Sequence, residues 1–533
     1  MLRVRGGRIV DPRNGRRNEA ADLCLRDGKV VDALPSDAPV LDARNLVVMP
    51  GGVDLHTHVA GPAVGAARLL CPEDDGRTMP TLPETGRRYA RMGYTTIMEA
   101  AVAPINARGA HEDLDAIPIV DKGIYVLLGN NEIALRLIRD GRFDGLREYV
   151  AWILEATRAY AVKVVNAGGV EAWKSGGPGS GLEFPASTGL GAPAILQALC
   201  AAAADLGLPH PIHLHMNGLG LPGNATLSLQ TMDLLKAYPV HFTHVQFHAY
   251  GGRTPRGLRS RAREIAAWIN AHPSATVDVG QVVFGPAITL SADAPAQHRL
   301  HQATGRKWFN LDVEMETGCG IVPHEYGEDH LVSAVQWAIG LEILLLVEDP
   351  WRVFLTTDHP NGGPFTAYPS ILRLLMDRRA REEAMARAHP RLKERTDLAG
   401  IAREYTLDEI AVITRAGPAR ALGLNDKGHL APGADADVVL YNPSEDIEAM
   451  FARPVVVLKD GVVVAREGEI VRETEGRTLH VAPPRTEGRV RTTFEKGLRD
   501  LFEKYSTVPF DDYPIEEEAL RRPEKVQARP RPA

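Results

Sequence analysis

The middle of the chain repeats one pattern eight times, a short apolar segment followed by a helical one. The apolar segments are runs such as Thr-Thr-Ile-Met at 95–98 and Val-Phe-Leu-Thr-Thr at 353–357, and helical stretches lie between them, for example 146–160, 260–271 and 406–422. Strands that alternate with helices form a parallel sheet, so eight units predict an α/β fold with a (β/α)₈ TIM-like barrel. The predicted strands end near His56, Glu99, Asn130, Asn166, His215, Val245, Gln281 and Asp358.

Both ends of the chain instead alternate apolar and polar residues, which is typical of short strands. Asn14-Gly15 and Asp27-Gly28 are signals for tight hairpin turns, and Asp460-Gly461 is the same signal late in the chain. We therefore predict one composite β-sandwich domain built from residues 1–48 and 426–482. These two segments bracket a barrel of residues 49–425.

Two segments exceed what a minimal barrel needs. Residues 60–84 follow the first strand, where a loop is placed to be a substrate lid; the alternative is a disordered insertion. In the tail, residues 483–533, apolar side chains at 494, 498, 501, 502 and 505 predict an amphipathic helix that covers a surface. We interpret this helical tail as an interface, and we expect residues after Arg521 to be loose or held by a neighbouring subunit.

Composition excludes several classes of function. A net charge of −7 gives no reason to expect nucleic acid as a partner. The four cysteines form no C-x₂-C pair, so we expect no iron–sulfur cluster, and we expect no nucleotide cofactor. The N-terminus lacks a signal-peptide pattern, and the longest apolar stretch, 334–347, is too short to span a bilayer. We expect a soluble cytoplasmic protein with no membrane contact.

Polar side chains at the predicted strand ends indicate a metal site. His56 and His58 lie two apart, so both imidazoles point the same way from a strand, although chance alone gives about 0.6 such pairs among 18 histidines. The prediction of a metal site therefore depends on three further residues, because His215, His244 and Asp358 each end another strand. Strand ends of a barrel converge on one face, and imidazole and carboxylate ligands suit Zn²⁺ or a similar divalent ion.

Lys163 adds a chemical prediction to this set. It lies among valines on the fourth strand, where a charged amine is costly unless it is paired or its pKa falls. A neutral amine can react with CO₂ to form a carbamate, whose two oxygens can bridge two cations. Lys174 is the rival, but it lies in a Gly-rich loop, so we prefer Lys163.

This pattern resembles the amidohydrolase superfamily: His-x-His after strand one, Lys on strand four, His on strands five and six, and Asp on strand eight. The stretch 428–439 is similar to that superfamily's returning β-strand motif. Within the superfamily, the chain resembles the A subunits of formylmethanofuran dehydrogenase and of the bacterial formyltransferase/hydrolase complex. The similar stretches are 49–54, 92–101, 129–131, 243–252, 314–318, 334–340 and 356–365.

The resemblance implies a binuclear site with two divalent ions, which we expect to be zinc. His56 and His58 would bind one ion, His215 and His244 the other, carboxylated Lys163 would bridge them, and Asp358 would ligate and shuttle protons. On strand five we prefer His215 to His213, because His215 is nearer the strand end and is followed by a loop. Six neighbours are candidate second-layer or substrate contacts: Asn130, Asn131, Asn166, Gln246, His248 and His359.

The implied reaction is hydrolysis of the N-formyl amide of a methanofuran-type coenzyme to formate and a free amine. The implied partners are a formyltransferase subunit with further subunits of a hetero-oligomeric complex in one-carbon metabolism. One alternative is the methanogen-type direction, condensation of formate with the amine. Others are a cyclic-amide hydrolase of the dihydropyrimidinase or dihydroorotase kind, and a non-catalytic scaffold; the scaffold is disfavoured because no ligand position is empty.

Overall fold

A curved sheet of eight parallel strands forms the centre of the computed structural model, which describes residues 1–182, 189–311, 319–484 and 489–529. Neighbouring strands pair in chain order along the whole sheet. The seam is closed by a parallel bridge between Thr57 and His359, where the His58 amide donates to the His359 carbonyl at 2.7 Å. The eight strands are β6 (Gly52–Thr57), β7 (Tyr94–Val102), β8 (Asp121–Leu127), β9 (Ala161–Val165), β10 (Ile212–His215), β11 (Val240–Phe242), β14 (Ala275–Asp278) and β18 (Val353–Phe354).

Helices follow the barrel strands and pack their apolar faces on the sheet, which confirms the predicted α/β barrel. The helix expected at 146–160 is α5 (Phe143–Ala156), and the one expected at 260–271 is α9 (Ala262–Ala271). The helix expected at 406–422 begins at a capping box, in which Thr406 and Glu409 satisfy each other's backbone amides. Further helices of the layer are α2 (Leu82–Arg91), α3 (Ala107–Asp115), α7 (Ala192–Asp205), α8 (Ala225–Leu235) and α11 (Leu331–Leu346).

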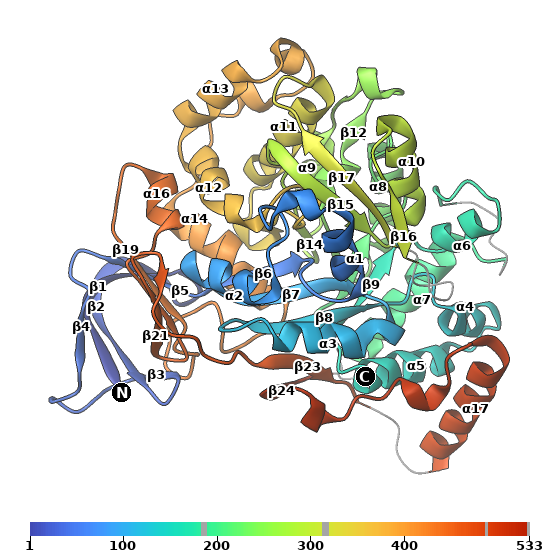
Figure 1. Ribbon diagram of the computed structural model, residues 1–533, viewed down its shortest axis with the longest axis horizontal. Coiled ribbons are helices and arrows are strands. Elements are labelled where there is room, and N and C mark those ends of the chain that lie inside the picture. Colours follow the sequence, from blue (N-terminus) through green and yellow to red (C-terminus); the bar gives the residue numbers. More distant parts are fainter. Residues whose placement is uncertain (183–188, 312–318, 485–488, 530–533) are drawn as a thin grey trace.

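The two ends of the chain meet in a second, mixed sheet of nine strands (Figure 1). Its order is β22-β21-β20-β19-β5-β1-β2-β3, with β4 beside β1. The join is antiparallel, between β5 (Val47–Pro50) and β19 (Val438–Tyr441). Asn14-Gly15, Asp27-Gly28 and Asp460-Gly461 all lie at hairpin turns, as predicted. The remaining strands are β1 (Leu2–Asp11), β2 (Arg16–Arg26), β3 (Lys29–Val31), β4 (Val40–Asp42), β20 (Val456–Lys459), β21 (Val462–Arg466) and β22 (Glu469–Ile470).

A small antiparallel sheet after strand β14 was not predicted. It has the order β15-β17-β16, formed by β15 (Gly285–Ser291), β17 (Cys319–Tyr326) and β16 (Phe309–Leu311). Residues 60–84 are ordered against it, because α1 (Pro62–Leu70) buries Val64 and Ala67 against Leu290 and Ile321. The alternative of a disordered insertion is therefore wrong, and a lid function for this segment stays a prediction. The stretch 314–318 lies outside the described residues.

The C-terminal tail covers the chain's own barrel. Helix α17 (Arg489–Tyr505) packs beside α4 (Glu132–Arg139) and α5, at the lower right of Figure 1. Phe502 and Phe510 both contact Trp152, with the Phe510 and Trp152 rings stacked at 4.4 Å. Residues 522–529 were expected to be loose or held by a neighbouring subunit, but this chain itself holds them. Strand β24 (Pro523–Gln527) pairs in parallel with β23 (Thr478–Ala482), which meets β8 at Lys122. Among the described residues, no helix is long and apolar enough to cross a membrane.

Candidate active site

The predicted ligands converge at the C-terminal ends of the barrel strands. Lys163, His215, His244, Asp358 and His58 line one cavity of about 590 Å³. His56 lies just beneath, with its ring centroid 5.3 Å from that of His58 and 5.4 Å from that of His244. The His215 and His244 rings are 4.6 Å apart. All six side chains are therefore brought together, although β9 and β18 are almost two hundred residues apart in the chain.

Asp358 stands between the two histidines of the first strand. Its Oδ1 lies 2.9 Å from Nε2 of His56 and 3.2 Å from Nε2 of His58, and the Asn361 side chain donates to the same oxygen at 3.1 Å. Burial alone raises the pKa of Asp358, but His56 and His244 outweigh it and hold that pKa well below its ordinary value. Asp358 is therefore a carboxylate that faces imidazole nitrogens in a buried site.

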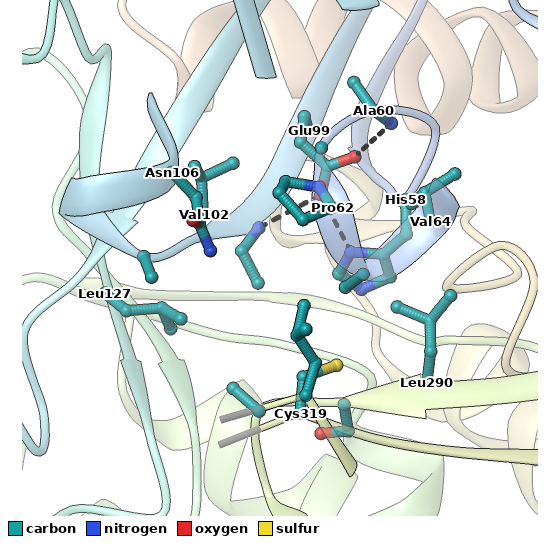
Figure 2. Close-up of a pocket in the computed structure, with 17 residues that line it drawn as sticks. His58, Ala60, Pro62, Val64, Glu99, Val102, Asn106, Leu127, Leu290 and Cys319 are labelled. Atoms are coloured by element: carbon teal, nitrogen blue, oxygen red, sulfur yellow. Dashed lines mark hydrogen bonds and ion pairs between the residues drawn. The ribbon is translucent and has the colours of Figure 1, made fainter. Parts of the chain in front are cut away.

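Glu99, at the end region of β7, holds His58 in place. Its Oε1 lies 3.0 Å from Nδ1 of His58, and its Oε2 accepts from the Ala60 amide at 3.0 Å (Figure 2). The same Oε2 accepts from the Val59 amide at 2.6 Å. Burial lowers the pKa of His58, but the bonds to Asp358 and Glu99 outweigh it and raise that pKa to about 9. Figure 2 shows His58 and Glu99 among the residues that line a small cavity. The volume of this cavity is about 40 Å³, large enough for a water molecule.

Lys163 is buried on β9, with 2 % of its surface exposed. It makes no ion pair or hydrogen bond with a residue that the structure describes, and burial lowers its pKa to about 8 despite the fields of Asp358, Asp278 and Glu99. A substantial share of this amine is neutral near pH 8, the form that reacts with CO₂. The rival, Lys174, ends α6 (Gly169–Lys174), is partly exposed, and does not line the cavity.

His215 and His244 form the other half of the site. Asp293 Oδ2 lies 3.3 Å from Nε2 of His215, which leaves Nδ1 as the nitrogen available to a metal ion. The His244 amide donates to Asp278 at 2.9 Å. His213, the alternative to His215 on β10, does not line the cavity and points to a cluster of histidines beneath it.

The six predicted neighbours take different positions. Asn130 and Asn131 act on the backbone: Asn130 donates to the Val165 carbonyl at 2.9 Å, and Asn131 caps helix α4. Asn166 donates to Asp293 at 2.9 Å and thereby supports the carboxylate that contacts His215. His248 contacts the His215 and His244 rings at 5.6 and 5.5 Å. Two more are buried beside the site without lining the large cavity, Gln246 and His359.

Backbone strain is concentrated at the strand ends of this site. Asn166, His244 and Asp358 have φ of 43°, 37° and 49°, in the left-handed region that non-glycine residues rarely adopt. The backbone at Gly280 passes close to His244, and only glycine fits there. A Cβ at position 280 would lie 2.4 Å from the His244 Cβ. Such strain persists only where the surrounding structure enforces it, and it is frequent at active sites.

Sequence reasoning missed the supporting carboxylates. Glu99 and Asp278 both lie at or near strand ends, so the rule that identified the other site residues could have found them. Asp293 lies in a loop before α10 (Ala294–Thr304), where no such rule applies. The unpredicted sheet also supplies a cavity wall, with Thr289, Leu290 and Ser291 from β15 and His324 and Tyr326 from β17.

The donor set fits a divalent metal ion. His56, His244 and Asp358 each offer one ligand atom within 4.8 Å of the others. Nε2 of His56 is buried with no hydrogen-bond partner among the described residues, although the Asp358 oxygen is 2.9 Å away. Ligand atoms on a tetrahedral zinc ion, with bonds near 2.1 Å, are about 3.4 Å apart. The two atoms are therefore placed as ligands of one cation would be.

Comparisons with known proteins identify the family of the chain. A model of the amidohydrolase family matches residues 39–465. The chain is 39 % identical to Protein FwdA of Methanocaldococcus jannaschii (97 % of this chain, 96 % of that protein). It is 43 % identical to the A subunit of the formyltransferase/hydrolase complex Fhc of Methylorubrum extorquens (90 % of this chain, 91 % of that protein).

A solved structure extends the likeness to the whole fold. A chain of the formyltransferase/hydrolase complex FhcABCD from Methylorubrum extorquens, solved with methylofuran, superposes with a TM-score of 0.94 at 40 % identity, covering 99 % of this chain and 100 % of that one. The chain is therefore a member of the amidohydrolase family of metal-dependent hydrolases, in the group that includes FwdA and the A subunit of Fhc.

Proposed function

We propose that this chain hydrolyses the N-formyl amide of a formylated methanofuran-type coenzyme to formate and the free amine. The observation that carries the proposal is its likeness, over nearly the full length, to one chain of a complex solved with methylofuran. The complete His, Lys and Asp set at the mouth of the barrel supports it. A cavity of about 590 Å³ is within the usual range for small-molecule sites.

The metal centre is proposed to hold two divalent ions, with zinc preferred. His56 and His58 would bind one ion, His215 and His244 the other, Lys163 as its carbamate would bridge them, and Asp358 would complete the first site. Carbamate formation joins the neutral Lys163 nitrogen to the carbon of CO₂ and releases one proton. When bound, such ions polarise a carbonyl and lower the pKa of a water molecule.

Asp358 is the proposed proton carrier. It is held as a carboxylate, so it can accept the proton of the attacking water and pass it to the leaving amine nitrogen. Asn361 donates to Oδ1 of Asp358 and orients it, and Tyr326 donates to the Asn361 carbonyl at 2.9 Å and lines the cavity.

The setting is proposed to be a cytoplasmic hetero-oligomeric complex that includes a formyltransferase, as the name of the complex that contains the Methylorubrum relative indicates. The same residues serve the opposite direction, condensation of formate with the amine. A cyclic-amide hydrolase uses a similar ligand set, but nearly full-length similarity favours the formyl coenzyme.

The test is an assay of the purified complex with the formylated coenzyme, formate with free coenzyme, and dihydrouracil. Release of formate supports the proposal, and net condensation would assign the opposite direction. Ring opening of dihydrouracil without formate release would overturn it.

Lys163→Gly tests the bridging carbamate. We expect zinc affinity to fall by more than about 100-fold, since loss of an outer partner alone costs 10–100-fold. Added propionate should restore part of the metal binding and activity, because its carboxylate can occupy the space of the carbamate. Lys174→Gly is the matched control and should bind zinc as the parent does. Normal zinc content in Lys163→Gly without propionate would contradict the bridging role.

A further inference from the structure

Two buried histidines lie in line beneath His56, and neither lines the large cavity. Nδ1 of His56, on β6, is 3.0 Å from Nε2 of His213 on β10. Nδ1 of His213 is in turn 3.0 Å from Nε2 of His210. The row ends at the backbone, where Nδ1 of His210 lies 2.8 Å from the Ala421 carbonyl oxygen. All three imidazoles are fully buried.

The Ala421 carbonyl fixes where the protons lie. A carbonyl oxygen can only accept a hydrogen bond, so Nδ1 of His210 carries a proton and donates a hydrogen bond to it. Burial lowers the pKa of His210 to about 3, so the ring is neutral and its Nε2 is an acceptor. The hydrogen between His210 and His213 therefore belongs to Nδ1 of His213. A neutral His213 then has an unprotonated Nε2, which accepts from Nδ1 of His56.

The opposite polarity is unfavourable. If Nε2 of His213 carried the proton, Nδ1 of His213 would accept from His210, and Nδ1 of a neutral His210 would face the Ala421 oxygen at 2.8 Å. Two acceptors would then meet inside the protein, which leaves buried polar atoms unsatisfied. Each histidine of the row has one tautomer in which every contact pairs a donor with an acceptor.

The surroundings of His56 demand the same tautomer. Its Nδ1 also lies 3.3 Å from Oδ2 of Asp278 and contacts Oγ1 of Thr243. Asp278 accepts from three other donors, which are the His244 amide (2.9 Å), the Thr356 hydroxyl (2.8 Å) and Nε2 of His241 (3.0 Å). A carboxylate with this environment is an acceptor, so it too requires a proton on Nδ1 of His56.

We propose that His210 and His213 are positioning residues of the metal centre, a histidine relay that runs from the Ala421 carbonyl and fixes His56 with the Nε2 lone pair directed at the metal beside Asp358. The inference rests on the proposed role of His56 as a ligand. It explains why Nε2 of His56 and a carboxylate oxygen, two acceptors in this tautomer, lie 2.9 Å apart. Outer partners of metal-bound histidines set tautomer and ring orientation in this way.

The test compares two replacements of His213 in the full-length chain. Gln keeps the relay, because its carbonyl oxygen accepts from His56 and its amide donates to His210; Leu breaks it. We expect His213→Leu to weaken zinc binding by roughly 10–100-fold at one of two ions. His213→Gln should bind both ions as the parent does. Zinc affinity is measured by chelator competition and stoichiometry by elemental analysis, with Co²⁺ absorption spectra as a second, activity-independent readout of the ligand field.

The outcomes separate the relay from the metal site itself. A parent chain that binds no zinc would overturn the proposed function. A parent that binds two ions, with His213→Leu equal to it or with His213→Gln as weak as His213→Leu, would overturn the relay. If His213→Leu does not fold, His210→Leu and His210→Gln repeat the comparison one step further from the metal. Equal zinc affinity in that second pair would then overturn the relay.

Discussion

Buried carboxylates gather at both ends of the barrel, but their partners differ. At the N-terminal end of the strands, Asp121, Asp435 and Asp437 lie close enough together to resemble a metal site. Protein cations already fill it: Nζ of Lys427 lies 2.5, 2.8 and 3.3 Å from these three side chains, and Nζ of Lys459 lies 3.1 Å from Asp121. Arg477 adds a further contact to Asp121 at 2.9 Å.

At the C-terminal end, the carboxylates face imidazoles, and no lysine or arginine of the described residues forms an ion pair with them. Asp358 faces His56 and His58, and the buried Lys163 makes no ion pair with a described residue. Clustered carboxylates alone are thus a poor sign of metal binding. The two ends differ in whether lysine and arginine side chains occupy the space between the carboxylates. In barrels of this type, the C-terminal face carries chemistry and the opposite face carries stability.

The largest expected effect comes from Asp358→Asn, which removes the negative charge of this side chain at nearly constant size. It acts at the C-terminal end of the strands, here called the reactive end. We expect kcat/KM for formate release to fall roughly 10²–10⁴-fold, the usual contribution of a general acid–base group. The melting temperature should change little, because the residue serves chemistry. The measurement is steady-state kinetics on the complex, with zinc content determined in parallel. Full activity in this variant would remove Asp358 from the proposed mechanism.

A substitution at the N-terminal end of the strands should lower the stability of the chain and leave its activity unchanged. Lys427→Met removes a fully buried ammonium and leaves Asp121, Asp435 and Asp437 short of one cation, which we expect to cost about 3–5 kcal/mol in the free energy of unfolding. Zinc content and kcat of the folded fraction should be unchanged. Denaturant unfolding of the metal-free chain measures the loss.

Lys29→Met is the matched control for that prediction. Its ammonium contacts Asp435 at 2.7 Å and Asp426 at 3.0 Å, but the side chain is 41 % exposed. Its loss should cost at most about 1 kcal/mol, as for other solvent-exposed pairs. Equal destabilisation by Lys427→Met and Lys29→Met would show that burial of an ion pair does not determine its contribution to the free energy of unfolding.

The sequence was sufficient to predict features with a local signal. Hairpin turns follow from Asp-Gly and Asn-Gly pairs. The convergence of His215, His244 and Asp358 on one cavity was predictable because strand ends of a barrel meet. The relay beneath His56 was not predictable, because it depends on which side chains of β6 and β10 face each other across the barrel. Likewise, the apolar spacing of the tail predicted a covered face, but not that Trp152 of the same chain covers it.

Acid should destabilise the chain through His111, at the N-terminal end of the barrel. Nε2 of His111 lies 3.0 Å from the Thr157 carbonyl, and burial lowers its pKa to about 4, against 6.5 for an exposed histidine. The unfolded chain therefore binds this proton more readily than the folded one. The stability that the neutral ring contributes is complete above pH 6.5 and is lost as the pH falls from there towards 4.

His111→Gln keeps a donor for the Thr157 carbonyl and removes the titrating group. Between pH 8 and pH 5 the parent should lose about 2 kcal/mol more free energy of unfolding than the variant, from a pKa difference of about 2.5 units. Both chains are compared without metal, so that zinc release at the reactive end contributes nothing and the other buried histidines cancel. An identical pH dependence in parent and variant would show that His111 does not contribute to the acid sensitivity of the fold.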